Sequence, residues 1–422
     1  MTSHQSRSMV WPYSVFKKHV QSKLATSDIH DPKKAPVPDY YPDTPLIRKT
    51  ISRYYDCVTV MDQRVGEIMS QLREDGLADN TIVFFFSDHG VGLPRAKRWL
   101  YDSGTHIPLI VRIPNFFRAS TQGVPGTLDQ QLVSSIDLAP TVLKLTGIDV
   151  PDYMQGRAFL GKQLKVNREY VFGARDRMDE RYDIIRMVRD KRFRYIRNYE
   201  PLKPYYQYMN TPEKGATMKE IRRSEKSDNL PLAARLFSAK KKPIEELYDL
   251  KSDPHEICNL SNDPNHIQQL KKMRQAHYKW VRETRDIGLI PEPEIVKREL
   301  VYGSRYEILR QKNSPNMIVR LGETAALASS GKDALPLLLI ATRDVDAAVR
   351  YWGVIGIGNI APKKSVNALL VTRKLLRDSS LSVRVAASRA LSRMGKPQES
   401  FPVLKNALTG PDQWARLQAA IV

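Results

Sequence analysis

The sequence predicts a protein of two parts, an α/β domain followed by an all-α domain of repeated helices. A helical pattern of apolar residues over 46–76 leads into a short apolar run at 82–86, Ile-Val-Phe-Phe-Phe. This order of helix and strand is typical of layered α/β folds. In the second part, helices rich in small residues open with arginines spaced 30, 34 and 32 residues apart: Arg320, Arg350, Arg384 and Arg416.

The charge of the chain points to anionic partners. Its 422 residues, enough for two to three domains, include 67 basic and 46 acidic side chains, a net charge of +21. Such an excess favours nucleic acid, anionic polysaccharide or a membrane surface. A solvated basic surface explains it equally well. No apolar stretch reaches the roughly 18 residues that a membrane-spanning helix needs.

The run at 82–86 is the centre of the predicted α/β domain. It is continuous, apolar and rich in strand formers, which predicts a buried strand of a mainly parallel sheet. Asp88 and His89 follow it directly. Ligands of open α/β sheets bind at the carboxyl ends of the strands, so these side chains are candidate ligands of a metal.

The remaining elements of the first part follow from local patterns. Residues 1–45 contain five prolines between 32 and 45, which predicts an extended surface loop. Residues 170–174 and 182–199 are expected to form strands. Apolar and basic side chains alternate in the second segment, which predicts an antiparallel hairpin with one face in water. We expect a helix entered through Pro140, a long surface excursion over 200–243 and a closing helix over 267–285.

Two separated motifs carry a resemblance to a known family. Asp88-His89-Gly90, followed by Lys97-x-x-x-Tyr101-Asp102-x-Gly104-x-x-x-Pro108, resembles the C-terminal half of the sulfatase signature. The segment from Glu246 to Leu260, ELYDLKSDPHEICNL, is similar to one near the end of sulfatase domains. It follows the first motif in the expected order.

The resemblance implies an alkaline-phosphatase-like α/β sulfatase domain, incomplete, over residues 1–300. A linker is expected at 301–315. Residues 316–422 resemble HEAT-like repeats, in which helix pairs stack into a solenoid. An ordinary helical bundle is the alternative for this part.

The resemblance also implies roles for individual residues. Asp88 and His89 would bind a metal, which is Ca²⁺ in the family. Because calcium prefers oxygen ligands, the imidazole of His89 favours a transition metal such as Zn²⁺ as an alternative. Mg²⁺ is a further alternative. Lys97 would contact the sulfate as a catalytic residue. His4 would contact the sulfate or donate a proton to the leaving group.

Four further residues are predicted to bind substrate. His106 stands where many sulfatases have an arginine, and Arg175, Arg177 and Asp179 lie in a loop expected to line the pocket. A basic rim would suit an anionic sulfated sugar, because arginine pairs bidentately with sulfate or carboxylate. The expected partner is thus a sulfated sugar or another sulfate ester. We expect no nucleic acid and no membrane span, and the repeats leave a protein partner open.

The nucleophile of the family is missing from this sequence. Sulfatases convert a cysteine in a C-x-P-S-R context to formylglycine, but Cys57 lies in RYYDCVTVMD and Cys258 in HEICNL. The Asp-Asp metal pair of the family is also absent. We therefore expect an N-terminally truncated sulfatase that is inactive as given. Whether the two cysteines pair is open.

The activity expected from the family is hydrolysis of a sulfuric ester or sulfamate on sulfated glycans, as in heparan N-sulfatases. The alternatives are a phosphodiesterase or phosphatase of the same superfamily and a non-enzymatic repeat scaffold. Family members usually work in the periplasm or outside the cell, and we expect the same here.

Overall fold

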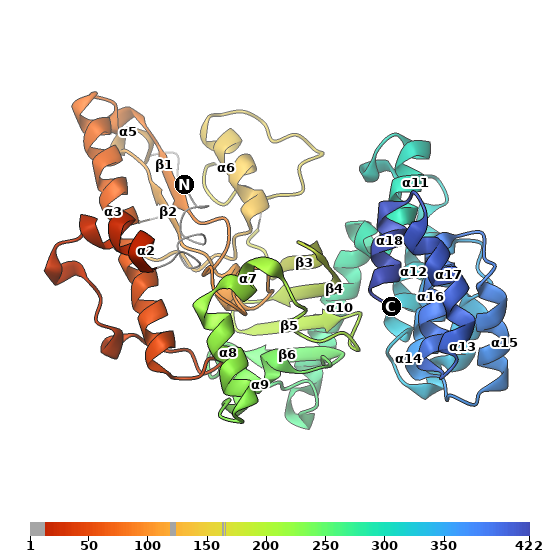
Figure 1. Ribbon diagram of the computed structural model, residues 1–422. Helices are drawn as coiled ribbons and strands as arrows, with labels where there is room; N and C mark the ends of the chain where they lie inside the picture. The colour runs from red at the N-terminus through yellow and green to blue at the C-terminus, as the bar shows by residue number, and fades with distance from the viewer. Residues whose placement is uncertain (1–12, 119–123, 163, 165) are drawn as a thin grey trace.

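The computed structural model describes the whole chain except residues 1–12, 119–123, 163 and 165. Figure 1 shows a long helix beside a short two-stranded ribbon at one end, a four-stranded sheet in the middle and stacked helices at the C-terminal end. Among the described residues, no helix is both long and apolar enough to cross a membrane.

The predicted helix over 46–76 is confirmed as α3, Pro45–Glu74. The side chain of Thr44 accepts a hydrogen bond from the backbone N–H of Ile47 and caps the first turn. Gly76 ends the helix with a φ of 68°, a conformation that glycine adopts without strain. The segment before it is not simply extended, since it forms short helices: α2 (Tyr13–His19), η1 (Gln21–Lys23), η2 (Thr26–Asp28) and η3 (Pro32–Lys34).

The predicted strand at 82–86 is present as β1, Val83–Phe86, but the parallel sheet is wrong for the described residues. There, β1 pairs only with β2, Leu109–Arg112, and the pairing is antiparallel. The segment between the two strands folds back on itself, so the chain returns in the opposite direction without a crossover helix. The strand is not buried either: Phe86 of β1 is 42% exposed and Ile110 of β2 is 62% exposed.

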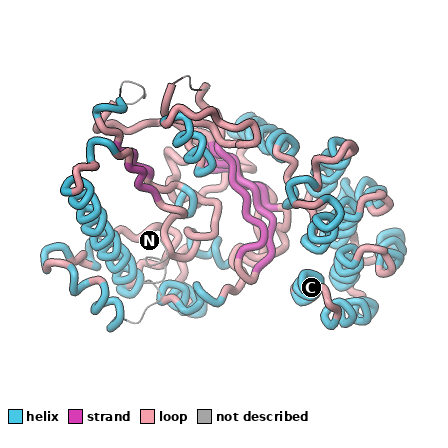
Figure 2. Tube along the Cα trace, turned by 90° about the horizontal axis from the view of Figure 1, so that it is seen from above, coloured by secondary structure: helices cyan, strands magenta, loops and turns pink. Residues whose placement is uncertain are grey.

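The second sheet has four antiparallel strands in sequence order, seen from above in Figure 2: β3 (Val171–Met178), β4 (Arg181–Arg189), β5 (Phe193–Asn198) and β6 (Glu245–Asp249). The predicted hairpin is therefore confirmed, but the prediction that one of its faces lies in water is wrong. Arg186 and Arg194 are fully buried among the apolar residues with which they alternate.

Both faces of this sheet are covered, which explains the burial of its arginines. On one face Ile185, Met187 and Ile196 pack in a core with Trp99 and Leu100 of the first motif. The other face packs on α10, Ile267–Glu283, which confirms the predicted closing helix. A charged side chain between two covered faces must be paired, and each of these arginines contacts acidic partners.

Residues 200–243 are not a loose surface excursion. They form α7 (Asn210–Lys214), α8 (Ala216–Lys226) and α9 (Leu232–Ser238). Met218 and Ile221 of α8 are each 1% exposed in the core that also holds Ile47 and Ile51 of α3. Three short helices complete the first part: α4 (Asp102–Thr105), α5 (Asn115–Arg118) and α6 (Leu138–Leu145), the last entered through Pro140 as expected.

The predicted repeats are confirmed as stacked helices: α12 (Ser314–Leu327), α13 (Leu335–Ala341), α14 (Ala347–Ile360), α15 (Val366–Leu375), α16 (Leu381–Arg393), α17 (Pro397–Thr409) and α18 (Gln413–Ala420). Helix α14 packs between α12 and α16. Two of the arginines that marked the pattern join neighbouring repeats, since Arg320 donates to Asp344 and Arg350 to Asp378, both at 2.8 Å.

The sheet and the repeats share one hydrophobic core. Tyr182, Ile184 and Tyr199 of the sheet region pack with Trp352 of α14. Between them lie α11 (Glu292–Tyr302) and the segment expected to be a linker, 301–315. Two of its residues, Ile308 and Leu309, are 4% and 1% exposed and belong to the same core.

Candidate active site

Asp88 and His89 lie side by side in the loop that follows β1. The His89 Nε2 atom is 3.4 Å from Asp88 Oδ1, and Nδ1 is 2.7 Å from the carbonyl oxygen of Gly90. Because a carbonyl oxygen only accepts, Nδ1 is the donor in this hydrogen bond, and Nε2 is the ring nitrogen that faces Asp88. A histidine held by a backbone carbonyl through one nitrogen is typical of metal ligands that use the other.

These two side chains alone do not complete a metal site. Calcium takes six to eight oxygen ligands and zinc three or four protein ligands. No group of three His, Cys, Asp or Glu side chains suited to a metal occurs within the described ranges. Asp88 and His89 therefore supply two donors, and further ligands would have to come from outside this pair.

Lys97 lies in the same loop and is partly buried, with its backbone N–H donating to Val91 O at 2.9 Å. Burial, and then the neighbouring charge of Arg98, lower the pKa of Lys97, while Asp88 and Asp179 act in the opposite direction. Arg98 is the next residue in the chain and pairs with Asp179, which joins these charges to the Lys97 loop. The structure thus brings together a predicted metal ligand, the predicted sulfate-binding lysine and one predicted substrate residue.

Arg98 is a member of this group that the sequence analysis missed. Its Nε atom contacts Asp179 Oδ2, which joins the first motif to the turn between β3 and β4. Both residues have positive φ, 81° for Arg98 and 51° for Asp179. Such conformations are uncommon outside glycine and concentrate at functional sites. The adjacency of Arg98 to Lys97 in the motif was the available signal.

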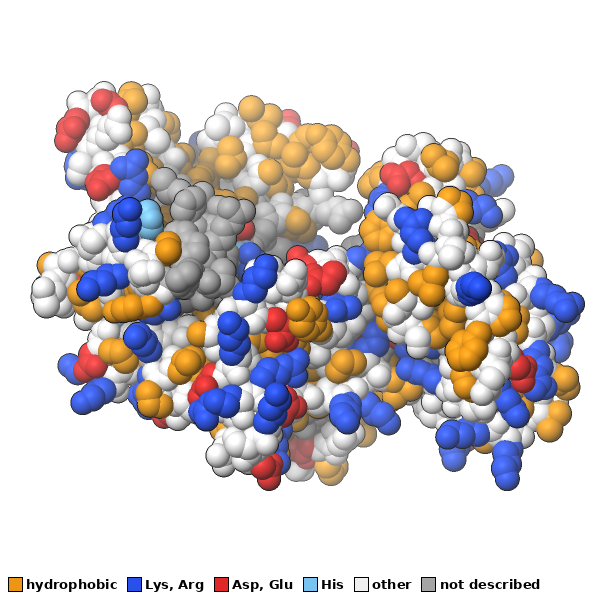
Figure 3. Space-filling view, viewed as in Figure 1, with side chains coloured by type: hydrophobic (Ala, Val, Ile, Leu, Met, Phe, Trp, Pro, Cys, Tyr) orange, Lys and Arg blue, Asp and Glu red, His pale blue; other side chains and the backbone are white. Residues whose placement is uncertain are grey.

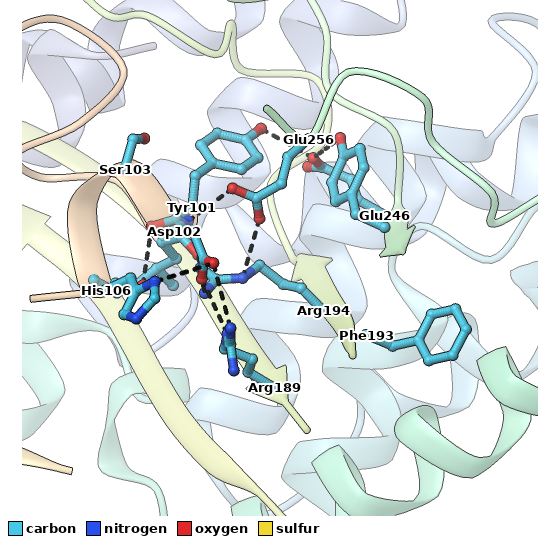
Figure 4. A network of polar contacts seen from close by, with 12 residues as sticks. Tyr101, Asp102, Ser103, His106, Arg189, Phe193, Arg194, Glu246 and Glu256 are labelled. Atoms are coloured by element: carbon cyan, nitrogen blue, oxygen red, sulfur yellow. Dashed lines mark hydrogen bonds and ion pairs between the residues drawn. The ribbon is translucent and has the colours of Figure 1, made fainter. Parts of the chain in front are cut away.

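The loop carrying Lys97 is held by a buried polar network, shown in Figure 4. Asp102 accepts a hydrogen bond from Arg189 Nε at 3.0 Å and contacts Arg194. Its carboxylate also lies 3.6 Å from His106 Nδ1. Burial alone would raise the pKa of Asp102, but His106, Arg194 and Arg189 together hold it well below its usual value. Asp102 therefore stays ionised and anchors the loop.

Glu256 closes the network from the second motif. Its Oε2 atom accepts a 2.7 Å hydrogen bond from the backbone N–H of Asp102, and its Oε1 atom lies 3.0 Å from Arg194 Nε. Its own carbonyl accepts from Arg95 at 2.7 Å. Burial raises the pKa of Glu256 to about 7, with Arg194 opposing this and Asp102 adding to it.

The two sequence motifs therefore meet in space. The phenol of Tyr101 donates to Glu246 Oε2 at 2.9 Å, and Tyr248 donates to the same oxygen at 2.7 Å. Gly104 is required here by close approach, because a Cβ atom would lie 2.2 Å from Ala96 O. Tyr101, Asp102 and Gly104 of the motif thus position the loop rather than line an open pocket.

Arg175 and Arg177 lie elsewhere than expected. They sit on strand β3, not in a loop. The buried Arg175 guanidinium stacks 4.4 Å from the ring of Trp99 and lies 3.4 Å from Asp183. Arg177 contacts Glu292 and donates to Ile290 O at 2.8 Å. Their predicted substrate role remains a prediction, and both guanidinium groups are already engaged within the protein.

The other predicted residues have distinct surroundings. The His106 side chain is 71% exposed beside Asp102, so it is accessible to a ligand. His4 lies outside the described residues. Cys57 is buried and Cys258 is exposed, and no disulfide joins the two.

Comparisons with known families agree with the motifs. Residues 11–148 match the model of the sulfatase family. Residues 94–236 match the model described as N-sulphoglucosamine sulphohydrolase, C-terminal, and residues 310–422 match HEAT repeats. Residues 11–236 are therefore similar to sulfatases over two overlapping family models, and a match to HEAT repeats follows them.

Individual relatives lead to the same family. The chain is 41% identical to an ulvan-active sulfatase of Formosa agariphila over 62% of this chain and 43% of that protein. It is 29% identical to human N-sulphoglucosamine sulphohydrolase over 65% of this chain and 56% of that protein. A solved structure of a 2-O GAG sulfatase aligns at 22% identity over 63% of this chain and 52% of that one, with a TM-score of 0.42. The chain spans about half the length of the curated relatives that it matches.

Proposed function

We propose that this chain provides the sulfate-binding and metal-binding side of a sulfatase that hydrolyses sulfuric esters or sulfamates of sulfated glycans. The observation that carries the proposal is the grouping of Lys97 with Asp88 and the Arg98–Asp179 pair. The buried network of Asp102 and Glu256 holds the loop that presents them.

Each residue has a defined chemical task in this proposal. The ammonium of Lys97 binds a sulfate oxygen and stabilises the charge that develops as the sulfuryl group is transferred. Asp88 and His89 hold the metal, Ca²⁺ or alternatively Zn²⁺ or Mg²⁺, and His4 contacts the sulfate or protonates the leaving group. His106 and Asp179 contact the sugar. In the family, formylglycine supplies the nucleophile and the metal supplies charge stabilisation.

The similar proteins support a sulfated glycan as the substrate class. Their names include an ulvan-active sulfatase and N-sulphoglucosamine sulphohydrolase. The grouped charges of this chain suit such a ligand, because a partly buried lysine binds an anion more strongly than an exposed one. We place the enzyme outside the cytoplasm, as is usual in the family.

The experiment is calorimetric titration of the purified chain with an N-sulfated heparin disaccharide and with its desulfated form. We expect binding of the sulfated form only, and its loss in Lys97→Ala. Lys251→Ala is the matched control, because that lysine is exposed and lies in the turn after β6. Equal binding of both disaccharides, or undiminished binding by Lys97→Ala, would contradict the proposal.

Turnover is tested separately. We expect no sulfate release by purified residues 1–422, because neither Cys57 nor Cys258 lies in a C-x-P-S-R context. Sulfate release that Asp88→Ala abolishes would show that this expectation is wrong.

One observation favours a second candidate, a phosphodiesterase or phosphatase of the same superfamily. His89 directs Nε2 toward Asp88, and imidazole with carboxylate suits zinc better than calcium. Titration with a sugar phosphate in the same calorimetric assay separates the two. Tighter binding of the phosphate than of the matched sulfate, dependent on Zn²⁺, would favour phosphoryl transfer.

A further inference from the structure

The helical repeats carry a concentrated positive charge. Residues 310–422 contain 17 Lys and Arg against 7 Asp and Glu, a net charge of +10. Figure 3 shows basic side chains outweighing acidic ones over these helices. Part of this charge is neutralised by ion pairs between repeats, such as Arg320–Asp344 and Arg350–Asp378. The position of the remaining basic side chains therefore indicates where an anionic partner could bind.

Four lysines occupy the same kind of turn in successive repeats. Lys332 follows α12, Lys363 and Lys364 follow α14, and Lys396 follows α16. Lys332, Lys364 and Lys396 are each separated by 32 residues. All four are exposed, and within the described part of the chain none lies within 4.0 Å of a carboxylate. We call these four residues the lysine edge.

Hydrogen bonds show that the helix ends beneath these lysines lie side by side. Asn359, near the end of α14, donates to the carbonyl of Ala328, which follows α12, at 3.0 Å. Arg393, at the end of α16, donates to the side-chain oxygen of Asn359. Each lysine turn begins within five residues of one of these linked positions. Packed helices lie about 8–10 Å apart, so the lysines form a row along one edge of the repeats.

Arg393, at the end of α16, is a further basic side chain beside this edge. Burial, and then the charge of Arg389, lower its pKa to about 10 against the effect of Glu200, so it stays protonated at neutral pH. Two carboxylates lie close in sequence, Asp333 and Glu399. Glu399 is held by Arg373 at 2.7 Å and 2.8 Å, and Asp333 is the nearby acidic side chain that forms no ion pair with a described residue.

We propose that the lysine edge binds a polyanionic sulfated glycan at a distance from the active site. The choice of a glycan rests on the proposed function. The turns contain no aromatic side chain, so they offer no stacking platform for the bases of a single-stranded nucleic acid. Flexible lysine ammonium groups in a row suit a flexible chain of anionic groups. A second attachment point raises the effective concentration of a polymer at the catalytic part of the chain.

A membrane surface is the less suitable partner. Binding to it takes apolar side chains beside the basic ones. The turns of the lysine edge present one exposed large apolar side chain, Val366, which is 67% exposed at the start of α15. Free sulfate is also unsuitable, because the lysines stand in separate repeats rather than around one point.

The experiment measures binding of a fluorescein-labelled heparin dodecasaccharide to the full chain by fluorescence anisotropy. The test variant changes Lys332, Lys363, Lys364 and Lys396 to Gln. The matched control changes four exposed lysines of the N-terminal region to Gln, which removes the same charge: Lys17, Lys18, Lys23 and Lys34. We expect about tenfold weaker binding for the test variant and less than about twofold for the control.

Two further controls separate the loss of positive charge from a failure to fold. Arginine at the same four positions must preserve heparin binding, and circular dichroism must show that all variants fold. Equal weakening in the test and control variants, or none in either, would overturn the proposal. So would equally tight, edge-dependent binding of a DNA duplex or of phosphatidylserine vesicles.

The proposed function can fail independently of this inference. The disaccharide titration with Lys97→Ala reports on the active site, and the lysine-edge variant must leave that titration unchanged. If the disaccharide does not bind but heparin binding depends on the edge, the proposed function is wrong and the edge remains a polyanion site.

Discussion

Tyr101 and Glu246 are joined by a 2.9 Å hydrogen bond from the phenol to the carboxylate, across 145 residues of sequence. Each belongs to a different motif, and both side chains are buried. The contact is one of several that fasten the Lys97 loop to the four-stranded sheet. Removing either partner would therefore weaken the support of the candidate active site.

Tyr101→Phe should destabilise the protein by about 1–2 kcal/mol, because Glu246 loses one of its buried donors. The measurement is the midpoint of urea unfolding. Tyr153→Phe is the control, since Tyr153 is 73% exposed and its hydroxyl can be replaced by water. Equal midpoints for wild type and Tyr101→Phe would contradict the role given to this hydrogen bond.

The stability of the protein should depend on pH through Glu256. Its pKa is about 7 in the folded protein against an ordinary value of 4.5. Between these values the folded protein holds a proton that the unfolded chain has released. The free energy of unfolding should therefore fall as pH rises from 4.5 to 7.

We expect this fall to amount to about 1–3 kcal/mol and to be missing in Glu256→Gln. Urea unfolding of both proteins at several pH values measures it, and the difference between their curves isolates Glu256 from other titrating groups. Parallel curves for the two proteins would show that Glu256 has an ordinary pKa.

Binding of the sulfated disaccharide should weaken at a pH below the ordinary lysine pKa of 10.5, because the pKa of Lys97 is lowered. Lys97→Arg should bind across the whole range, since a guanidinium stays protonated. Calorimetric titrations between pH 7 and about pH 11 provide the measurement. A wild-type profile identical to that of Lys97→Arg would argue against Lys97 as the titrating group.

The buried ion pair between Glu200 and Arg389 should be essential for the joint stability of the sheet and the repeats. Arg389 donates to Glu200 at 2.8 Å and 3.1 Å, and the Glu200 side chain is 1% exposed. Arg389→Leu leaves the buried Glu200 carboxylate without its strongest partner. The substitution should lower the free energy of unfolding by about 3–5 kcal/mol.

Arg373→Leu is the matched control, because the Arg373–Glu399 pair is 42% and 34% exposed. It should leave the melting temperature close to that of the wild type, because exposed ion pairs contribute little to stability. Thermal unfolding followed by circular dichroism compares the two variants. Similar melting temperatures for both would mean that the buried pair contributes no more than the exposed one.

Local patterns were sufficient for the helices of this protein. The spacing of apolar residues predicted α3 and α10, and the recurring arginines predicted the repeats, because these signals depend on neighbours within a few turns. The sheet was harder to predict. Arg186 and Arg194 alternate with apolar residues as a solvent-exposed face would. Arg186 pairs with Asp176 on the neighbouring strand and with Asp286, 100 residues away, and Arg194 pairs with Asp102, 92 residues away. No local pattern contains that information.

The candidate site was predictable to a similar extent. Asp88, His89 and Lys97 came from one motif, so their proximity followed from their spacing. Arg98 was missed because its partner, Asp179, is brought in by a turn of another sheet. Arg175 was expected in a loop because a run of charged residues is usually exposed, whereas the structure stacks it on Trp99.

The ribbon of β1 and β2 should open far more readily than the rest of the protein. A two-stranded sheet is at best marginally stable by itself, and both Phe86 and Ile110 leave large parts of their surface in water. Its amide protons should exchange with solvent early, whereas those of β4, in the middle of the covered sheet, should exchange last. Asp88 and His89 follow β1 closely in the chain. A ligand that binds them should therefore slow the amide exchange of β1 and leave the exchange of β4 unchanged.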